Sequence, residues 1–312
     1  MANKYFYTVT LLEAKKYIEK SFPNLLIKDI ELSGEGFDNI AYLINKKYIF
    51  LFSKRKHAAK QLKIEIKLLE NLRNILSVEI PNFEFIGKHI KSFPFVGYKK
   101  IEGRLLEKES FYGFNDNKME MIIKQLSKII TDLHSFPIVK AKLYGVRTTD
   151  FKKKYENEFK ATKEQIYPIV KKETKEYLND LFTQYLSNNE NFNYIPSLIH
   201  ADLNPSHILY DLKKAKIKGI IDFGDVQIGD PDFDLEPLYN TYGKNFLKKF
   251  LKFYKITNKK QLLLKLEFFK KYKPLQEIFA GLRESDSELQ RGLKKLRKKV
   301  KIWKQNSKSR NI

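Results

Sequence analysis

The chain has 312 residues and no cysteine, which excludes disulfides, thiolate metal sites and thiol nucleophiles. Its 60 basic and 37 acidic residues give a formal net charge of +23, but lysines occur in every segment, which favours a solvated surface over a nucleic-acid site. No apolar stretch approaches the roughly 18 residues that a membrane span needs, and residues 1–10 contain no signal-peptide core, so we expect a cytoplasmic protein without a membrane partner.

Apolar spacing in the first hundred residues predicts two helices and a group of short strands. The helical patterns cover 10–22 and 60–76. Strands are expected where short apolar runs lie between turn residues, at 27–32, 41–44, 48–52, 83–87 and 95–101. The simplest arrangement is a helix that crosses an antiparallel sheet, in a first lobe that spans residues 1–100.

Long helical patterns dominate a second lobe, which we assign to residues 101–312. They cover 118–134, 151–170, 175–188, 245–254 and 260–272, and short strands are expected at 197–199 and 218–221. Residues 291–312 hold ten basic residues and no acidic one, which predicts a charged helix with a solvated face. The predicted fold class is therefore α+β, with a small sheet lobe and a large helical lobe.

A polar loop between apolar flanks brings His200, Asp202 and His207 within eight residues of one another. An aspartate in such a loop can orient and deprotonate a substrate hydroxyl, and a residue five positions later can reach a metal from the same turn. Spacing alone also allows a structural interpretation, in which the polar groups cap the loop.

A second motif begins eight residues after Asp211 and has the pattern of a buried strand that ends in Asp222. A carboxylate at the exit of a strand can bind Mg²⁺, a hard cation that prefers carboxylate and phosphate oxygens. Asp-Phe-Gly alone could be a simple turn. Beside the first motif, it predicts a metal site.

These motifs continue along the chain in a recognisable order. They comprise His200, Asp202 and His207, then Ile221-Asp222-Phe223-Gly224-Asp225 and residues 229–234. The order resembles the aminoglycoside phosphotransferases, and is most similar to the 2''-phosphotransferases, which carry His rather than Asn at the place of His207. Segments 33–37, 64–69 and 94–103 are also similar to that branch, and the resemblance covers about residues 22–292. It implies a protein-kinase-like fold of two lobes.

The resemblance assigns roles around a bound nucleoside triphosphate. It makes Asp202 the catalytic residue and His207 and Asp222 the Mg²⁺ ligands. A turn over the phosphates is implied for Ser33, Gly34, Glu35, Gly36 and Phe37. The segment 95–101 becomes the hinge, where Phe95, Tyr98 and Ile101 flank the nucleobase, the backbone of Lys99 to Ile101 reads its edge, and Ile221 completes the nucleotide-binding set.

The chain departs from the pattern at the strand 48–52. Glu65 matches the helix glutamate that pairs with a strand cation in the family, but the strand position holds Leu51. Lys54 is the nearest cation that could meet Glu65. Either Lys54 substitutes or the site is weakened, and a solvated Lys54 stays possible.

The implied activity is transfer of the γ-phosphate of GTP or ATP to the 2''-hydroxyl of an aminoglycoside, by a monomer that confers resistance. A Tyr98 ring at the back of the base pocket would exclude adenine and favour GTP, unless it turns away. Asp202, Asp225 and Glu236 are expected to face the acceptor, although the segment 235–244 keeps only Glu236 of an acidic cluster in the resembling enzymes. A kinase of another small-molecule hydroxyl and a weakly active protein that binds an anionic partner stay open.

Overall fold

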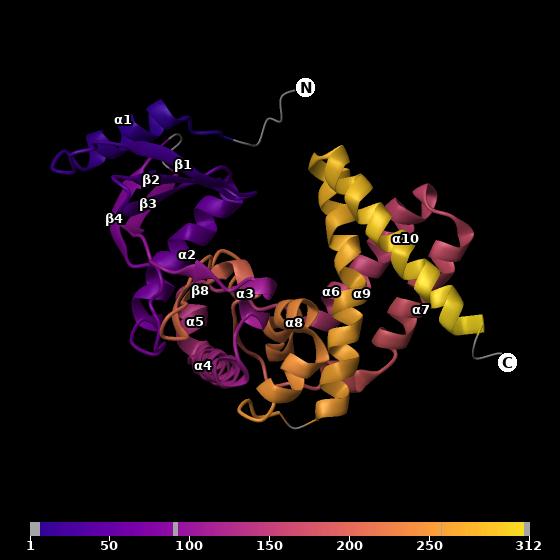
Figure 1. Cartoon of the computed structure of the whole chain (residues 1–312). Coiled ribbons are helices and arrows are strands. Elements are labelled where there is room, and N and C mark those ends of the chain that lie inside the picture. The colour runs from indigo at the N-terminus through magenta and orange to yellow at the C-terminus, as the bar shows by residue number, and fades with distance from the viewer. Residues whose placement is uncertain (1–6, 90–92, 257, 309–312) are drawn as a thin grey trace.

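The computed structural model describes residues 7–89, 93–256 and 258–308, which form two lobes (Figure 1). Five antiparallel strands build the sheet of the first lobe, in the order β1-β2-β3-β5-β4. Their bounds are β1 (Ile30–Glu35), β2 (Asn39–Ile44), β3 (Tyr48–Ser53), β4 (Phe83–Lys88) and β5 (Pro94–Lys99). All five lie at or near the predicted positions.

Two helices pack against this sheet. Helix α1 (Leu11–Ser21) begins with a capping box between Thr10 and Glu13, and its apolar face joins the core of the first lobe. Helix α2 (Lys56–Leu72) begins four residues before the predicted start. Its leucines, Leu68, Leu69 and Leu72, belong to the core of the second lobe, so α2 ties the lobes together.

The chain enters the second lobe between Lys99 and β6 (Arg104–Leu105), which pairs with β8. The division after residue 100 stays a prediction. Two small sheets follow, β6-β8-β9 and β10-β7. The remaining strands of these sheets are β7 (Ser197–Ile199), β8 (Ile208–Asp211), β9 (Lys216–Ile220) and β10 (Gln227–Gly229). The predicted polar loop therefore runs from β7 to β8, and Asp222 follows the end of β9.

Helices make up most of the second lobe. The α-helices are α3 (Lys108–Tyr112), α4 (Asp116–His134), α5 (Ile138–Leu143), α6 (Phe151–Ala161), α7 (Lys172–Leu186), α8 (Leu235–Phe250), α9 (Lys259–Glu284) and α10 (Asp286–Lys308). Short helical turns are η2 (Thr162–Ile166), η3 (Tyr167–Ile169), η4 (Asn189–Phe192), η5 (Pro205–His207) and η6 (Pro231–Asp234). No helix in the described ranges is long and apolar enough to cross a membrane.

Several helix boundaries differ from the predicted ones for identifiable reasons. The pattern over 151–170 divides after Ala161 into a π turn and a 3₁₀ turn, where Pro168 has no amide hydrogen to continue the helix. Helix α8 begins at Leu235 rather than 245, because Gly243 has non-helical dihedral angles (φ 76°) and splits the apolar pattern. Helix α9 continues through Pro274 as far as Glu284.

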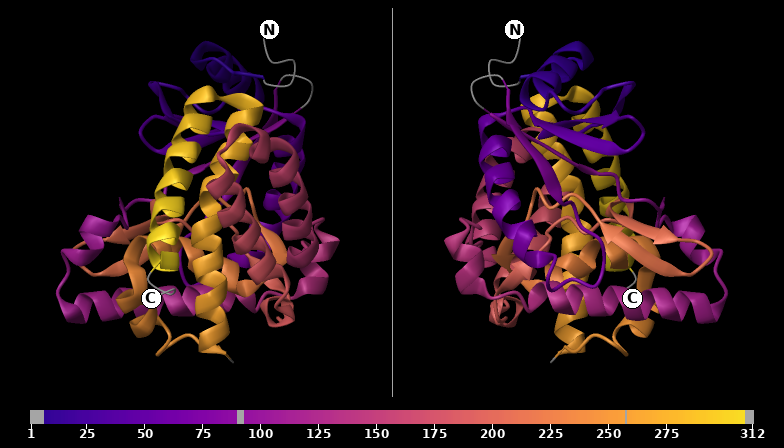
Figure 2. Two further views of the ribbon diagram at one scale, coloured as in Figure 1. Left: turned by 90° about the vertical axis from the view of Figure 1, so that its right-hand side faces the viewer. Right: turned by 90° about the vertical axis from the view of Figure 1, so that its left-hand side faces the viewer.

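The basic C-terminal segment is a packed helix rather than a solvated tail. Helix α10 runs back along α9 (Figure 2). It buries Leu293, Leu296 and Val300. Two glycines allow this close approach, since a Cβ at Gly281 would lie 2.2 Å from the backbone of α10 and one at Gly292 would lie 2.8 Å from a side chain of α9. Only the outer face of α10 is solvated as predicted.

Candidate active site

A cavity of about 640 Å³ lies between the two lobes. Most of the predicted nucleotide-site residues line it: Ser33, Gly34, Glu35, Gly36, Phe37, Glu65, Tyr98, Ile101 and Ile221. Three predicted catalytic or acceptor-side residues reach it as well, namely Asp202, Asp222 and Asp225. The cavity therefore brings together segments that are up to about two hundred residues apart in the chain.

Phe95 does not line this cavity, which corrects its expected position beside the nucleobase. The Lys99 side chain does not line it either, but the backbone role expected of Lys99 stays a prediction. Side chains alternate between the two faces of a strand, so Tyr98 lies on the opposite face of β5 from both. Phe95 is fully buried in the core of the first lobe, with its ring 4.7 Å from that of Phe52. Lys99 is exposed and borders a separate hollow.

Lys54 lies at the turn over the cavity rather than beside Glu65. Its Nζ donates to Glu35 Oε1 at 2.6 Å and to the Gly36 carbonyl at 3.2 Å. The expected pair between Lys54 and Glu65 is thus not formed. Lys54 directly follows β3, at the end of the sheet over which the 33–37 turn folds. Its side chain therefore reaches Glu35 and Gly36 in that turn.

Glu65 is buried below the cavity beside carboxylates. Burial, Asp222 and Asp225 raise the pKa of the Glu65 carboxyl to about 8. Among the described residues no lysine or arginine forms an ion pair with it. Leu51, at the position where the family pattern has a cation, lines the cavity instead.

Asp202, His207 and Asp222 form a compact donor cluster, with one ligand atom from each within 4.8 Å of the others. His207 Nδ1 lies 2.8 Å from the carbonyl oxygen of Asp202, which can only accept, so Nδ1 carries the hydrogen. The other ring nitrogen, Nε2, faces Asp222 Oδ2 at 3.5 Å, and at this distance a proton or a cation can lie between the two atoms. Two carboxylates and an imidazole suit a divalent cation such as Mg²⁺.

The loop that carries Asp202 is held in an unusual backbone conformation. Ala201 and Asp222 both have a φ of 65°, which costs a non-glycine residue roughly 1–2 kcal/mol each. The fully buried His200 accepts from the Asp202 amide at 3.3 Å and donates from Nε2 to the Ile221 carbonyl at 3.2 Å. His200 therefore joins the loop to the segment that ends in Asp222.

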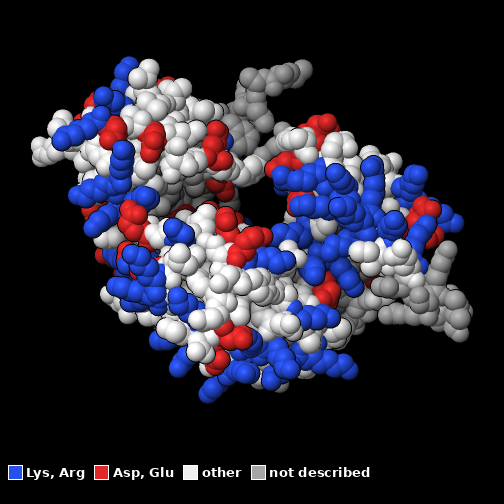
Figure 3. Space-filling view, in the orientation of Figure 1, with Lys and Arg blue, Asp and Glu red and all other residues white. Residues whose placement is uncertain are grey.

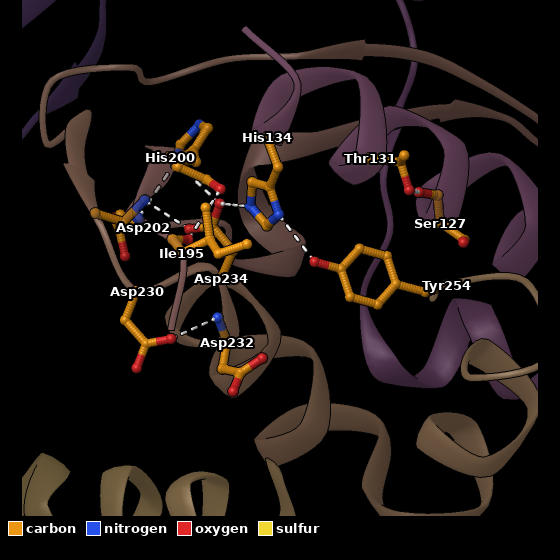
Figure 4. A network of polar contacts seen from close by, with 12 residues as sticks. Ser127, Thr131, His134, Ile195, His200, Asp202, Asp230, Asp232, Asp234 and Tyr254 are labelled. Atoms are coloured by element: carbon orange, nitrogen blue, oxygen red, sulfur yellow. Dashed lines mark hydrogen bonds and ion pairs between the residues drawn. The ribbon is translucent and has the colours of Figure 1, made fainter. Parts of the chain in front are cut away.

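Asp234 fixes the same loop, a role that no sequence pattern indicated. Its buried carboxylate accepts from the amides of His200 at 2.9 Å and Ala201 at 2.7 Å (Figure 4). His134 Nε2 lies 3.0 Å from it, and His134 Nδ1 lies 2.9 Å from the Tyr254 hydroxyl. The three alternating aspartates in 229–234 mark the segment in the sequence as unusual, but they do not indicate the partners of Asp234, which lie far away in sequence.

The two further carboxylates expected on the acceptor side have different environments. Asp225 lines the cavity, where burial raises the pKa of its carboxyl. Glu236 does not line this cavity; it lies at the start of α8, is 7% exposed, and has Oε2 3.7 Å from Lys273 Nζ. Its expected role toward the acceptor stays a prediction.

The two lobes, the cavity between them and the Asp202 loop define a kinase-type transferase. A family model described as the phosphotransferase enzyme family matches residues 29–269, and the chain belongs to this family. The predicted kinase-like α+β fold is confirmed.

Comparison with known proteins gives more specific likenesses. The uncharacterized protein YcbJ of Bacillus subtilis (strain 168) is 21% identical over 188 residues, 59% of either chain, so the match spans less than two thirds of that relative. The GDP and kanamycin complex of APH(2'')-IIIa is 31% identical, with 93% of this chain and 99% of that chain covered and a TM-score of 0.89. The gentamicin complex of APH(2'')-IIa, 23% identical over 93% and 97% with a TM-score of 0.77, supports the fold alone. The predicted resemblance to aminoglycoside 2''-phosphotransferases is confirmed.

Proposed function

We propose that this chain transfers the γ-phosphate of a nucleoside triphosphate to a hydroxyl of a small molecule. The observation that carries the proposal is the convergence of Asp202, His207 and Asp222 at the edge of the interlobe cavity. A carboxylate for the acceptor proton lies there beside a donor set for a divalent cation, as direct phosphoryl transfer requires.

The proposed mechanism uses few groups. The Asp202 carboxylate orients the acceptor hydroxyl and takes its proton, and burial, which raises the pKa of Asp202, makes it a better proton acceptor. The Asn204 amide donates to Asp202 Oδ1 and fixes the rotation of the carboxylate. Asp222 and His207 would hold Mg²⁺, which neutralises charge on phosphate oxygens when it is bound. The 33–37 turn closes over the phosphates.

The first acceptor to test is the 2''-hydroxyl of an aminoglycoside. This assignment is supported by the likeness to APH(2'')-IIIa, whose structure was solved with kanamycin and GDP. A second candidate is another small molecule with a hydroxyl. It is favoured by Lys273, whose ammonium group lies beside Glu236 and opposes a polycation there.

GTP is the proposed phosphate donor. Tyr98 is 6% exposed and lines the cavity, with its ring edge-on to Phe83 at 5.9 Å. Such a packed ring leaves less room for a base that must approach β5 closely. ATP remains the donor if the base binds away from Tyr98.

Product analysis tests the proposal. The purified chain is incubated with Mg²⁺, GTP or ATP, and a panel of hydroxyl compounds that includes kanamycin, and added phosphate is located by mass spectrometry. Asp202→Asn should lower turnover by roughly 10²- to 10⁴-fold. Asp116→Asn, at an 83% exposed carboxylate, is the matched control and should leave turnover unchanged. Normal turnover by Asp202→Asn contradicts the mechanism, and phosphate on a compound other than an aminoglycoside selects the second candidate.

A further inference from the structure

The acceptor side of the site contains an excess of cations around its carboxylates. The acceptor hydroxyl must lie next to Asp202, and the charged groups beyond Asp202 decide which molecules can approach it. Asp225 and Glu236 are carboxylates on this side. Lys270 and Lys273 are electrostatic neighbours of Glu236, and Arg147 and Lys154 are neighbours of Asp225, beside which Asp222 and Asp38 also lie.

Glu236 connects the catalytic loop to the helices α9 and α10. Burial is the largest influence on the pKa of the Glu236 carboxyl and raises it. Lys273 lowers this pKa and Asp202 raises it, so the charges of Lys273 and Asp202 act on the same carboxyl. Lys270 is a further electrostatic neighbour, and its Nζ lies 5.6 Å from the ring centroid of Tyr239. Lys270 and Lys273 of α9 therefore act electrostatically on Glu236, and Glu236 in turn interacts electrostatically with Asp202.

Lys299 of α10 adds another cation to this group. Burial and the nearby Lys270 lower the pKa of Lys299, which is half-buried between the helices. Lys270 and Lys299 form no ion pair with any residue that the structure describes. Glu267, the remaining carboxylate nearby, accepts a hydrogen bond from Tyr239. Like charges held together at a partly buried position favour an anion between them.

Asp225 has a similar environment on the other side. Arg147 opposes the rise in the pKa of Asp225 that burial causes. Burial lowers the pKa of Lys154, for which Glu158 and Asp225 are the carboxylate neighbours. The Lys154 ammonium group lies 5.1 to 5.3 Å from the centroids of three aromatic rings. Arg147 and Lys154 form no ion pair within the described ranges either.

The surface carries the same asymmetry. Lys and Arg side chains gather over α9 and α10 and extend to the hollow that separates these helices from the first lobe (Figure 3). Acidic side chains lie on the opposite side of this hollow and also at the tip where α9 and α10 meet, above the basic side chains. A ligand that enters the hollow meets a negative wall, where a divalent cation would bind, and a positive wall along α9 and α10.

We propose that the acceptor carries, besides its hydroxyl, an anionic phosphate or carboxylate group that Lys270, Lys273 and Lys299 bind. This inference rests on the proposed phosphotransferase function and defines the substrate class of the second candidate. The hydroxyl lies at Asp202, and the anionic group lies at the α9 and α10 wall. A polycation would meet repulsion from the same lysines.

Calorimetry on the chain loaded with GDP and Mg²⁺ tests the inference, because the nucleotide already fills the phosphate positions of the donor. The probes share a six-carbon skeleton and differ in charge: glucose 6-phosphate, gluconate, glucose and glucosamine, with kanamycin as a polycation. At least one anionic probe should bind about tenfold or more tightly than glucose and glucosamine. Comparison of glucose 6-phosphate with gluconate then distinguishes a phosphate from a carboxylate.

Two matched double variants locate the binding. Lys270→Gln with Lys299→Gln should weaken binding of the anionic probe by tenfold or more. Lys294→Gln with Lys298→Gln, on the exposed outer face of α10, should change it less than about twofold. Circular dichroism and thermal melting establish that both variants are folded.

Three results overturn the inference: tighter binding of kanamycin or glucosamine than of the anions, no binding of either anionic probe, or an equal loss in the two double variants. Equal loss would indicate a diffuse polyanion surface over α10. Phosphoryl transfer is measured separately. Lysine-dependent anion binding without transfer to any compound would refute the proposed function and leave the anion site, whereas transfer to kanamycin alone would refute the anion site and leave the function.

Discussion

The Glu65 carboxyl is buried near three aspartates, Asp222, Asp225 and Asp38, and Leu51 occupies the strand position where the family pattern has a cation. Burial, Asp222 and Asp225 raise its pKa to about 8. A carboxyl whose pKa is raised on folding binds its proton more tightly in the folded chain. Its contribution to the free energy of unfolding is therefore fully present below its ordinary pKa of about 4.3 and is lost as the pH rises through 8.

Glu65→Gln should remove this loss of stability at high pH. Without Mg²⁺, the free energy of unfolding of the parent should fall by a few kcal/mol between about pH 5 and pH 9, whereas the glutamine variant keeps its neutral hydrogen-bonding group throughout. Urea denaturation at several pH values measures the difference. Glu70→Gln, on the exposed face of the same helix, is the control and should follow the parent. An unchanged pH slope in Glu65→Gln would contradict the assignment.

Asp222 and His207 should differ in their importance for metal-dependent nucleotide binding. Mg²⁺ prefers oxygen ligands, so Asp222→Ala should abolish the effect of Mg²⁺ on GTP affinity and His207→Ala should reduce it less. Titration of GTP with and without Mg²⁺ measures both. Parent-like Mg²⁺ dependence in Asp222→Ala would exclude the proposed donor set.

At the residue scale, the sequence predicts what a short motif contains and misses what the fold brings from afar. Asp202 and His207 lie five positions apart on one loop, and Asp222 follows the neighbouring strand, so their convergence is predictable. The contact of Asp234 with His134 joins residues one hundred positions apart, and no local pattern encodes it. For the same reason the sequence left open whether Lys54 or no cation is the partner of Glu65.

At the scale of elements, α9 and η6 are joined by a buried ion pair network. Lys265 of α9 is 3% exposed and donates to Asp230 at 2.8 Å and to Asp232 at 2.6 Å. Both aspartates belong to the segment that ends in Asp234, so the network also supports the Asp202 loop. Removing one partner of a buried pair leaves an uncompensated charge, which is strongly destabilising.

Lys265→Met should lower the free energy of unfolding by about 3–5 kcal/mol. Lys249→Met removes an exposed pair with Asp116, whose atoms are 2.9 Å apart, and should cost less than about 1 kcal/mol. Denaturant unfolding of the two variants gives the comparison. Equal losses would mean that burial of Lys265 is not what makes the network stabilising.

Elements with a clear apolar period were predictable, and those shaped by packing were not. The five strands of the first lobe and helix α4 lie within a few residues of their predicted bounds. The first part of helix α8 was not predicted, because Gly243 interrupts the apolar period of the helix. Helix α10 was recognised as helical but not as packed, since the apolar residues of its packed face, Leu289, Leu293, Leu296, Val300 and Trp303, are spread among many lysines.

At the scale of the whole molecule, the proposed nucleotide specificity depends on a cavity that neither lobe forms alone. Tyr98 of the first lobe and Ile221 of the second both line it, so a bound nucleotide contacts both lobes and should stabilise them together. A ligand that binds only the folded chain raises its stability by RT ln(1 + [L]/Kd). The two-lobed fold was predictable from the apolar periods along the chain and from the motif order, whereas the shape of the cavity required the structure.

GTP should therefore raise the unfolding temperature more than ATP at equal concentration with Mg²⁺. Exclusion of adenine by the Tyr98 ring is expected to make GTP bind about ten- to two-hundred-fold more tightly, equivalent to roughly 1–3 kcal/mol at concentrations well above Kd. Tyr98→Ala should narrow the difference between GTP and ATP by improving ATP binding. Because the lost ring also lowers stability, each variant is compared with its own nucleotide-free form. Tyr48→Ala, on the adjacent strand and outside the cavity lining, should keep the preference. Equal stabilisation by ATP in the parent would refute the preference, and an unchanged difference in Tyr98→Ala would place the selectivity in another part of the cavity.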